Sequence, residues 1–280
     1  MSLDVLTRIP VTFEAADGGL THAPLVAGRL GDVTTLLVLD TGSDVHLLNK
    51  DLVDRLGLAF ENGEEGTDHS GATMPSWSVE DVGLELGEIE VTLGDVVGIP
   101  APPPFPPMGI GGILSPQHLH PTATTVIDLV AHELLLVEAA DEALPAWLEE
   151  RSPDLTALVL KRDDSFGMVV VPAAISPHDE IPTILNTGGK STEFGLGSVP
   201  SFAAAAFERL GGGVSGADVL GARMGAATLV VAGREIPVAS LVVREQMHDP
   251  QGMVGMDVLR GTVVAASADV TRPAVWQIPG

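Results

Sequence analysis

The stretch Leu37–Ser43 reads Leu-Val-Leu-Asp-Thr-Gly-Ser, an apolar run that ends in an acidic residue and a small-residue turn. Such a run predicts a buried strand that stops at Asp40. Because burial makes an unpaired carboxylate costly, an acid at this place is typical of a functional or paired group. The same plan returns at Thr183–Gly189, which reads Thr-Ile-Leu-Asn-Thr-Gly-Gly, with Asn186 in the place of Asp40.

Three further features recur in the same order after each of these stretches. They are a short helix that ends in glycine, a hairpin turn that contains glycine, and a glycine followed by two apolar residues. In the first and second copy respectively they are expected at Asp54–Gly57 and Glu208–Gly211, at Leu86–Ile89 and Gly233–Ile236, and at Gly112–Leu114 and Gly252–Val254. This common order predicts an internal duplication, with an N-terminal lobe at 1–142, a linker at 143–157 and a C-terminal lobe at 158–280.

The whole series resembles the retropepsin-like aspartic peptidases, and the resemblance covers nearly the entire chain. It is closest to the fused, pepsin-like arrangement, in which a single chain supplies both lobes. The resemblance implies an all-β fold of two β-barrel lobes with short helices, related by a pseudo-twofold axis. It also implies a centre shared by the two turns, with Asp40 as the catalytic carboxyl and Asn186 in the partner position.

Asn186 is the main departure from that pattern. Two carboxylates held close together share one proton, so that one acts as base and the other as acid on a water that attacks a peptide carbonyl. An amide cannot take that proton, and Asp40 loses a like-charged neighbour as a reason for a raised pKa. Asn186 is an engineered replacement of an aspartate, a natural decay to a pseudo-peptidase, or a sign that Asp40 turns from two chains pair.

The residues that follow each strand are expected to support the two turns. By resemblance, Thr41 and Thr187 interlock the turns through hydroxyl to backbone hydrogen bonds. Gly42 and Gly188 let the backbone approach the side chains at the centre closely.

Substrate contacts are expected from an acid and from two glycine-containing segments. Asp44 matches a position where retroviral peptidases carry an acid that binds substrate backbone. Gly66–Ser78, with Gly71 near its tip, is the expected flap of the first lobe, and Gly221–Ala227, which includes Gly225, occupies the corresponding place in the second. A closing hairpin excludes water and helps to position a peptide.

Composition excludes several other classes of function. The formal net charge of −24, from 38 acidic and 14 basic residues, repels phosphate backbones and anionic lipid, so no nucleic acid or membrane partner is expected. The absence of cysteine excludes disulfides and a cysteine nucleophile. His46, His118 and His120 lack a fourth ligand at usual spacing, so no metal and no cofactor is expected.

The sequence therefore predicts an aspartic endopeptidase that hydrolyses peptide or unfolded protein in a groove between two lobes, weak or inactive because of Asn186. The alternative is a non-catalytic protein that keeps the groove and binds peptides as a scaffold. No apolar run approaches the roughly 18 residues that cross a bilayer, and no signal peptide begins the chain. We expect a soluble, cytoplasmic monomer.

Overall fold

The computed structural model describes residues 3–63, 65–68, 70–80, 82–138, 140–162, 167–199, 207–245, 247 and 250–280. Strands predominate in this part of the chain, and its helices are short. The prediction of an all-β chain is therefore confirmed at this level. The described strands form open sheets rather than the closed barrels that we expected for each lobe.

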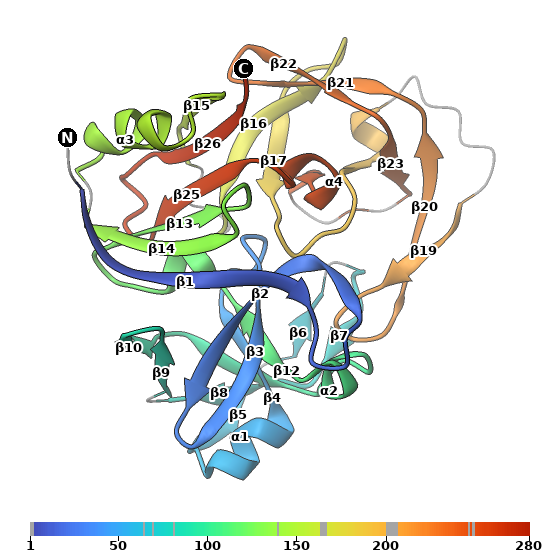
Figure 1. The fold of residues 1–280 in the computed structure, drawn as a ribbon. Helices are drawn as coiled ribbons and strands as arrows, with labels where there is room; N and C mark the ends of the chain where they lie inside the picture. The colour runs from blue at the N-terminus through green and yellow to red at the C-terminus, as the bar shows by residue number, and fades with distance from the viewer. Residues whose placement is uncertain are drawn as a thin grey trace.

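The largest sheet holds most of the strands from the first half of the chain and, from the second half, the strand at Leu155–Leu160 and the last two strands (Figure 1). Its main path runs β15-β26-β25-β13-β14-β1-β2-β3-β12-β4-β11-β8-β5, and β9 joins it through β2 and carries β10. The strands are β1 (Asp4–Glu14), β2 (Leu20–Leu30), β3 (Val33–Leu39), β4 (His46–Asn49), β5 (Phe60–Asn62), β8 (Trp77–Val79), β9 (Val82–Leu86), β10 (Ile89–Leu93), β11 (Val96–Ile99), β12 (Ile110–Leu114), β13 (Thr124–Asp128), β14 (Glu133–Glu138), β15 (Leu155–Leu160), β25 (Val263–Ser267) and β26 (Ala274–Pro279).

The second sheet lies wholly in the second half of the chain, in the order β19-β20-β23-β18-β24-β17-β16-β21-β22. Its strands are β16 (Val170–Ile175), β17 (Ile181–Leu185), β18 (Glu193–Gly195), β19 (Glu208–Gly212), β20 (Asp218–Met224), β21 (Ala227–Val231), β22 (Arg234–Val238), β23 (Leu241–Arg244) and β24 (Gly252–Val254). A separate hairpin is formed by β6 (Gly66–Thr67) and β7 (Thr73–Met74).

One pattern of strand pairing occurs twice in these sheets. In the first half, β3 lies parallel to β12, β12 antiparallel to β4, and β4 parallel to β11. In the second half, β17 lies parallel to β24, β24 antiparallel to β18, and β18 parallel to β23. The pattern places the strands that end at Asp40 and Asn186 in equivalent positions, each beside a strand that begins with, or contains, the recurring glycine motif.

The two halves are joined by pairing between their own strands. β13 of the first half pairs antiparallel with β25 of the second, from Thr124 opposite Ser267 to Asp128 opposite Val263. Helix α3 (Ala143–Arg151) lies in the expected linker and packs Leu144, among other buried apolar residues, against this part of the sheet. In Figure 1 these strands lie between the blue and cyan strands of the first half and the yellow and orange strands of the second.

The helices agree with the sequence in the first half and differ in the second. α1 (Lys50–Leu56) ends at Gly57, whose φ of 65° is left-handed as a glycine cap requires. Glu208–Gly211, expected to match it, is instead strand β19, paired with β20. The helix prediction there was wrong. The described part of the chain also holds α2 (Phe105–Met108), α4 (Met256–Leu259) and single turns at Pro116–His118 and Leu196–Ser198.

Candidate functional site

The two small-residue turns begin in the same way. Asp40 follows β3, and its backbone N–H donates to the carbonyl oxygen of Leu114 at 2.9 Å. Asn186 follows β17, and its N–H donates to the carbonyl oxygen of Val254 at 2.9 Å. Each turn therefore leaves its sheet where the neighbouring parallel strand ends, and each side chain starts from an equivalent backbone position.

Thr41 and Thr187 hold the two turns together through four hydrogen bonds. The N–H of Thr41 donates to Oγ1 of Thr187, and the N–H of Thr187 donates to Oγ1 of Thr41, both at 3.1 Å. The Thr187 hydroxyl donates to the carbonyl oxygen of Leu39 at 2.7 Å, and that of Thr41 donates to the carbonyl oxygen of Leu185. Both threonines are buried, so each hydroxyl uses its one proton and accepts one bond, as burial requires.

Glycine is required where the turns face each other. A β-carbon on Gly188 would lie 2.3 Å from Cγ of Asp40, and one on Gly42 would lie 2.4 Å from Nδ2 of Asn186. Each of these distances is far inside van der Waals contact, so neither position has room for a side chain. The structure thus brings together all six residues expected at the centre: Asp40, Thr41, Gly42, Asn186, Thr187 and Gly188.

The environment of Asp40 favours the protonated carboxyl. Burial raises its pKa to about 6, although the backbone N–H groups of Gly42 and Gly188 oppose that shift. The Gly42 N–H donates to Oδ1 at 2.8 Å. The raised pKa therefore arises from desolvation and needs no second carboxylate. Asp40 is a single group able to exchange a proton in mildly acidic solution.

Asn186 also accepts a backbone N–H of its own turn. Its Oδ1 accepts the N–H of Gly189 at 2.7 Å, one residue further along its turn than the Gly42 N–H that Asp40 accepts. Its Nδ2 donates to the sulfur of Met253 at 3.0 Å. The orientation of the amide follows from these partners, because only its oxygen can accept from Gly189. An aspartate in this place would keep the bond to Gly189 and lose the one to Met253.

A small residue follows the strand beside each turn, Ser115 after β12 and Gly255 after β24, and its backbone N–H is bonded to a side chain. Nδ1 of His46 accepts the N–H of Ser115 at 3.2 Å, and in the other half Oγ1 of Thr192 accepts the N–H of Gly255 at 3.2 Å. His46 is fully buried, and burial lowers its pKa to about 4. The ring is therefore neutral near neutral pH. The sequence alone did not indicate that His46 accepts this hydrogen bond, because Ser115 follows β12, a strand far from His46 in the chain.

The residues expected to contact substrate are less closely gathered. Asp44 is exposed, and a β-carbon on Gly167 would lie 3.1 Å from its Cβ. Gly71 has a φ of 84° in the turn between β6 and β7, as expected of a hairpin tip. Within the expected flap, position 69 lies outside the described residues.

The corresponding hairpin of the second half lies earlier than expected. Its turn joins β19 to β20, where the N–H of Gly213 donates to the carbonyl oxygen of Ala217 at 2.8 Å. Gly225 lies in the connection between β20 and β21, and a β-carbon there would meet nothing within 4 Å. The segment Gly221–Ala227, expected to take the place of the second flap, instead comprises the end of β20, this connection and the first residue of β21.

The two hairpins meet through Asp68, which sequence analysis did not single out. Oδ1 of Asp68 accepts the N–H of Ser70 at 2.8 Å, and Oδ2 accepts the N–H of Ser215 at 2.8 Å. A β-carbon on Gly213 would lie 2.0 Å from Oδ2, so this approach also needs glycine. These hydrogen bonds hold the pKa of Asp68 below its usual value, against the effect of burial.

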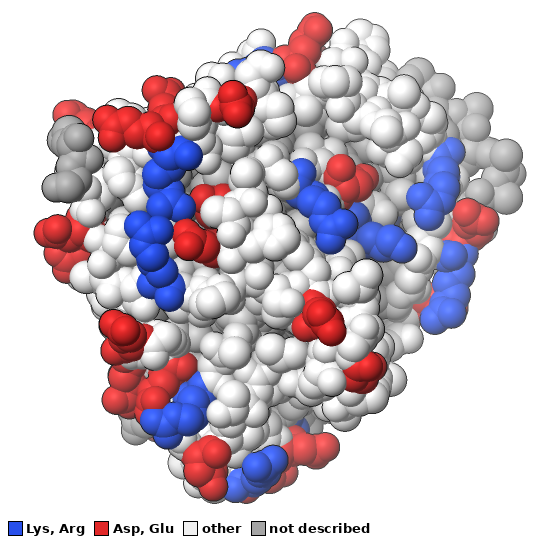
Figure 2. Space-filling view, viewed as in Figure 1, with Lys and Arg blue, Asp and Glu red and all other residues white. Residues whose placement is uncertain are grey.

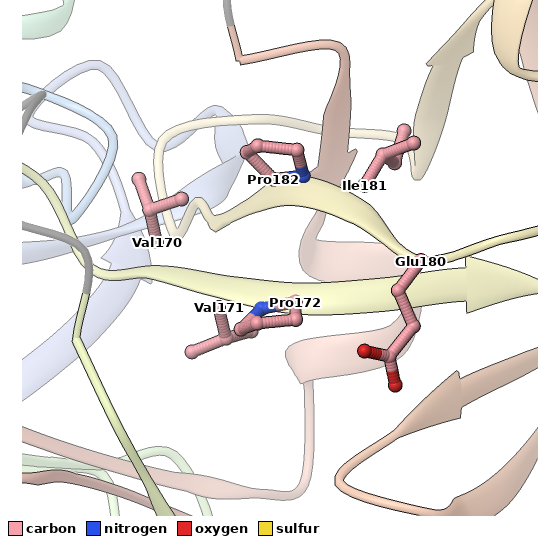
Figure 3. A pocket seen from close by; sticks show the side chains of 6 residues that line it. All are labelled: Val170, Val171, Pro172, Glu180, Ile181 and Pro182. Atoms are coloured by element: carbon pink, nitrogen blue, oxygen red, sulfur yellow. The ribbon is translucent and has the colours of Figure 1, made fainter.

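Two cavities lie elsewhere on the surface, and neither includes Asp40 or Asn186. The first, of about 260 Å³, lies on β16 and β17 and is lined mainly by apolar side chains (Figure 3). The second, of about 490 Å³, is formed by residues from both halves of the chain. The groove that we expected between the lobes does not correspond to either of them.

Histidines and acids do not form a metal centre in the described part of the chain. His118 bonds through Nε2 to the carbonyl oxygen of Gly167 at 2.8 Å, and Nδ1 of His120 accepts the N–H of Ala123 at 3.0 Å. Among the described helices, none has the length and apolar character needed to cross a membrane.

Comparison with known proteins adds no family to this picture. No protein-family model matches the sequence, and no curated protein matches it at a significant level.

Proposed function

We propose that this chain is an aspartic peptidase of the fused, retropepsin-like kind, which binds extended peptide or unfolded protein and is weak or inactive in hydrolysis. One observation carries the proposal: Asp40 and Asn186 end equivalent strands, and each packs on the glycine of the other's turn. A turn with only a structural role has no need to hold a carboxyl of raised pKa against a second, matching turn.

Asp40 would serve as the one proton-exchanging group. Its pKa of about 6 leaves it ionised at neutral pH, where it can accept a proton from water, and protonated in acid, where it can donate one to a carbonyl oxygen. Both roles are needed at once for amide hydrolysis. Asn186 can orient a water or a carbonyl, but it cannot take the second role, and for this reason we expect turnover to be low.

The other candidate function is peptide binding without hydrolysis. It is favoured by the amide of Asn186, whose oxygen and nitrogen both have partners that suit an amide, Gly189 and Met253. In this view Asn186 is the residue the site is adapted to, and Asp40 keeps the turns in place.

Changing Asn186→Asp distinguishes the two functions. Two carboxyls would then share the centre. Proton transfer by a positioned acid or base typically raises a rate by about 10²- to 10⁴-fold. We expect cleavage of an unstructured protein at acid to neutral pH to rise by at least about 100-fold and to be inhibited by pepstatin. The matched control is the double variant Asp40→Asn, Asn186→Asp, which keeps one carboxyl and one amide in exchanged places.

No increase at any pH, in a variant whose circular dichroism is unchanged, would refute the peptidase and leave peptide binding. Activity in the double variant as high as in the single variant would refute the need for both carboxyls.

A further inference from the structure

The cavity of about 490 Å³ lies where the start of β2 meets the second turn and α4. Its walls come from both halves of the chain: Leu20, Thr21, His22, Lys190, Met256, Asp257 and Arg260. Backbone hydrogen bonds join its second-half walls, because Met256 and Asp257 donate to the carbonyl oxygens of Gly189 and Lys190. The cavity is thus attached to the turn that carries Asn186.

One residue, Gly188, lies between His22 in this cavity and Asp40. Nε2 of His22 donates to the carbonyl oxygen of Gly188 at 2.9 Å. The N–H of the same Gly188 faces the carboxyl of Asp40 and lowers its pKa. Gly188 therefore contacts a wall of the cavity through its carbonyl and Asp40 through its N–H.

The cavity carries more positive than negative charge, in a chain whose net charge is −24. Within the described residues, neither Lys190 nor Arg260 has an acidic group within ion-pair distance. Its one acid, Asp257, accepts the hydroxyl of Thr192 through Oδ1 at 2.8 Å. Two cations thus line the cavity without an acidic partner among these residues.

The side chain of Arg260 is held by an aromatic ring. The guanidinium of Arg260 lies over the ring of Phe13, 4.7 Å from its centroid, which fixes the side chain on the rim. Burial lowers the pKa of His22, the Gly188 carbonyl raises it, and the charge of Lys190 lowers it further, so Lys190 acts close to this ring. Figure 2 shows blue side chains gathered over the region of α4, on a face where uncharged surface is extensive.

We propose that this cavity binds the carboxylate side chain of an acidic residue in the peptide. The inference rests on the proposed function, since it assigns a preference to the same peptide site. A guanidinium offers a carboxylate two parallel N–H donors, and an ammonium adds a mobile charge beside it. The cavity in Figure 3, lined by Val170, Pro172 and Ile181 with Glu180 at its edge, offers no such groups.

The preference is measured with fluorescent peptides on the full chain. Each peptide carries one Glu at a different position, and its partner carries Gln there. We expect one position at which Glu binds about tenfold more tightly than Gln at low salt, from two partly exposed charge pairs. The difference should shrink at high salt. Lys190→Ala and Arg260→Ala should each reduce it, whereas Lys161→Ala, which removes an exposed charge outside the cavity, should not.

Equal binding of Glu and Gln peptides at every position would overturn the cavity proposal and leave peptide binding intact. An equal loss in Lys161→Ala would overturn it too, because the effect would then come from net charge. If no peptide binds, the proposed function fails, and the cavity is tested alone with N-acetylglutamate and N-acetylglutamine. Shifts of the His22 ring resonances with the first compound only, lost in Lys190→Ala, support the cavity; their absence overturns it.

Discussion

Replacing Asp40 by Asn should change the dependence of stability on pH in a defined direction. The pKa of Asp40 rises from 3.8 to about 6 on folding, chiefly through burial. Between these values the folded chain binds more protons than the unfolded chain, so the folded state loses stability as pH rises through this window. The contribution is fully present below pH 3.8 and lost above about 6.

The size of the effect follows from the shift. About two pKa units correspond to at most about 3 kcal/mol, and since Asp40 is half-buried we expect about 1 to 3 kcal/mol. Asn has nearly the same shape and no charge. The difference in unfolding free energy between Asp40→Asn and the parent should therefore rise by that amount from pH 3.5 to pH 7.5.

Urea unfolding of both proteins across this range measures the difference, and subtraction cancels every other group that titrates in both. A difference that stays flat, or one that changes in the opposite direction, would refute burial as the origin of the shift. It would also remove the reason to regard Asp40 as a group with a perturbed proton affinity.

Three other changes test the surroundings of the turns. The folded pKa of His46 is about 4, so stability should fall by up to about 3 kcal/mol as pH drops from 6.5 to 4, and melting curves of His46→Asn should lack this fall. Gly188→Ala should cost about 1 to 3 kcal/mol or more in chemical unfolding through its contact with Asp40, whereas Gly211→Ala, which meets nothing within 4 Å, should not destabilise; equal losses would contradict the packing argument. Asp68→Ala should cost about 1 to 3 kcal/mol and speed hydrogen exchange at the Ser215 amide, and unchanged exchange there would show that the two hairpins are not held by this carboxyl.

The first half of the fold followed the sequence because local signals and long-range contacts agree there. Leu37–Leu39 is apolar enough to be a strand in any context, and the structure buries all three residues. α1 places Leu52 and Val53 in the core and ends at a left-handed glycine, as its pattern predicts. The hairpin between β9 and β10 turns at the glycine that its pattern indicated.

In the second half, a prediction made from local sequence alone failed. Glu208–Gly211 has the same residue types as the end of α1, yet it pairs with β20, and a β-carbon on Gly221 would lie 2.5 Å from Cδ1 of Leu210. Long-range pairing therefore overrides a helix signal of only four residues. The turn at Gly213 was missed for the same reason. Glycine is required there by close contact with Asp68, which is far away in the chain.

In the candidate site, too, residues that depend on local sequence were predicted and residues that depend on distant contacts were not. The two turns could be predicted because strand, acid or amide, threonine and glycine are neighbours in the sequence. His22, His46 and Asp68 could not, because each acts on a backbone group from a distant segment: Gly188, Ser115 and Ser215. A lone polar residue carries no period or spacing that would indicate its partner.

The antiparallel pairing of β13 with β25 has a consequence for how the protein comes apart. Because this pairing and the threonine bonds between the turns both cross from one half of the chain to the other, neither half can melt without exposing hydrogen-bonding groups of its counterpart. The chain should therefore lose its structure in one cooperative transition, rather than in two steps that follow its two halves.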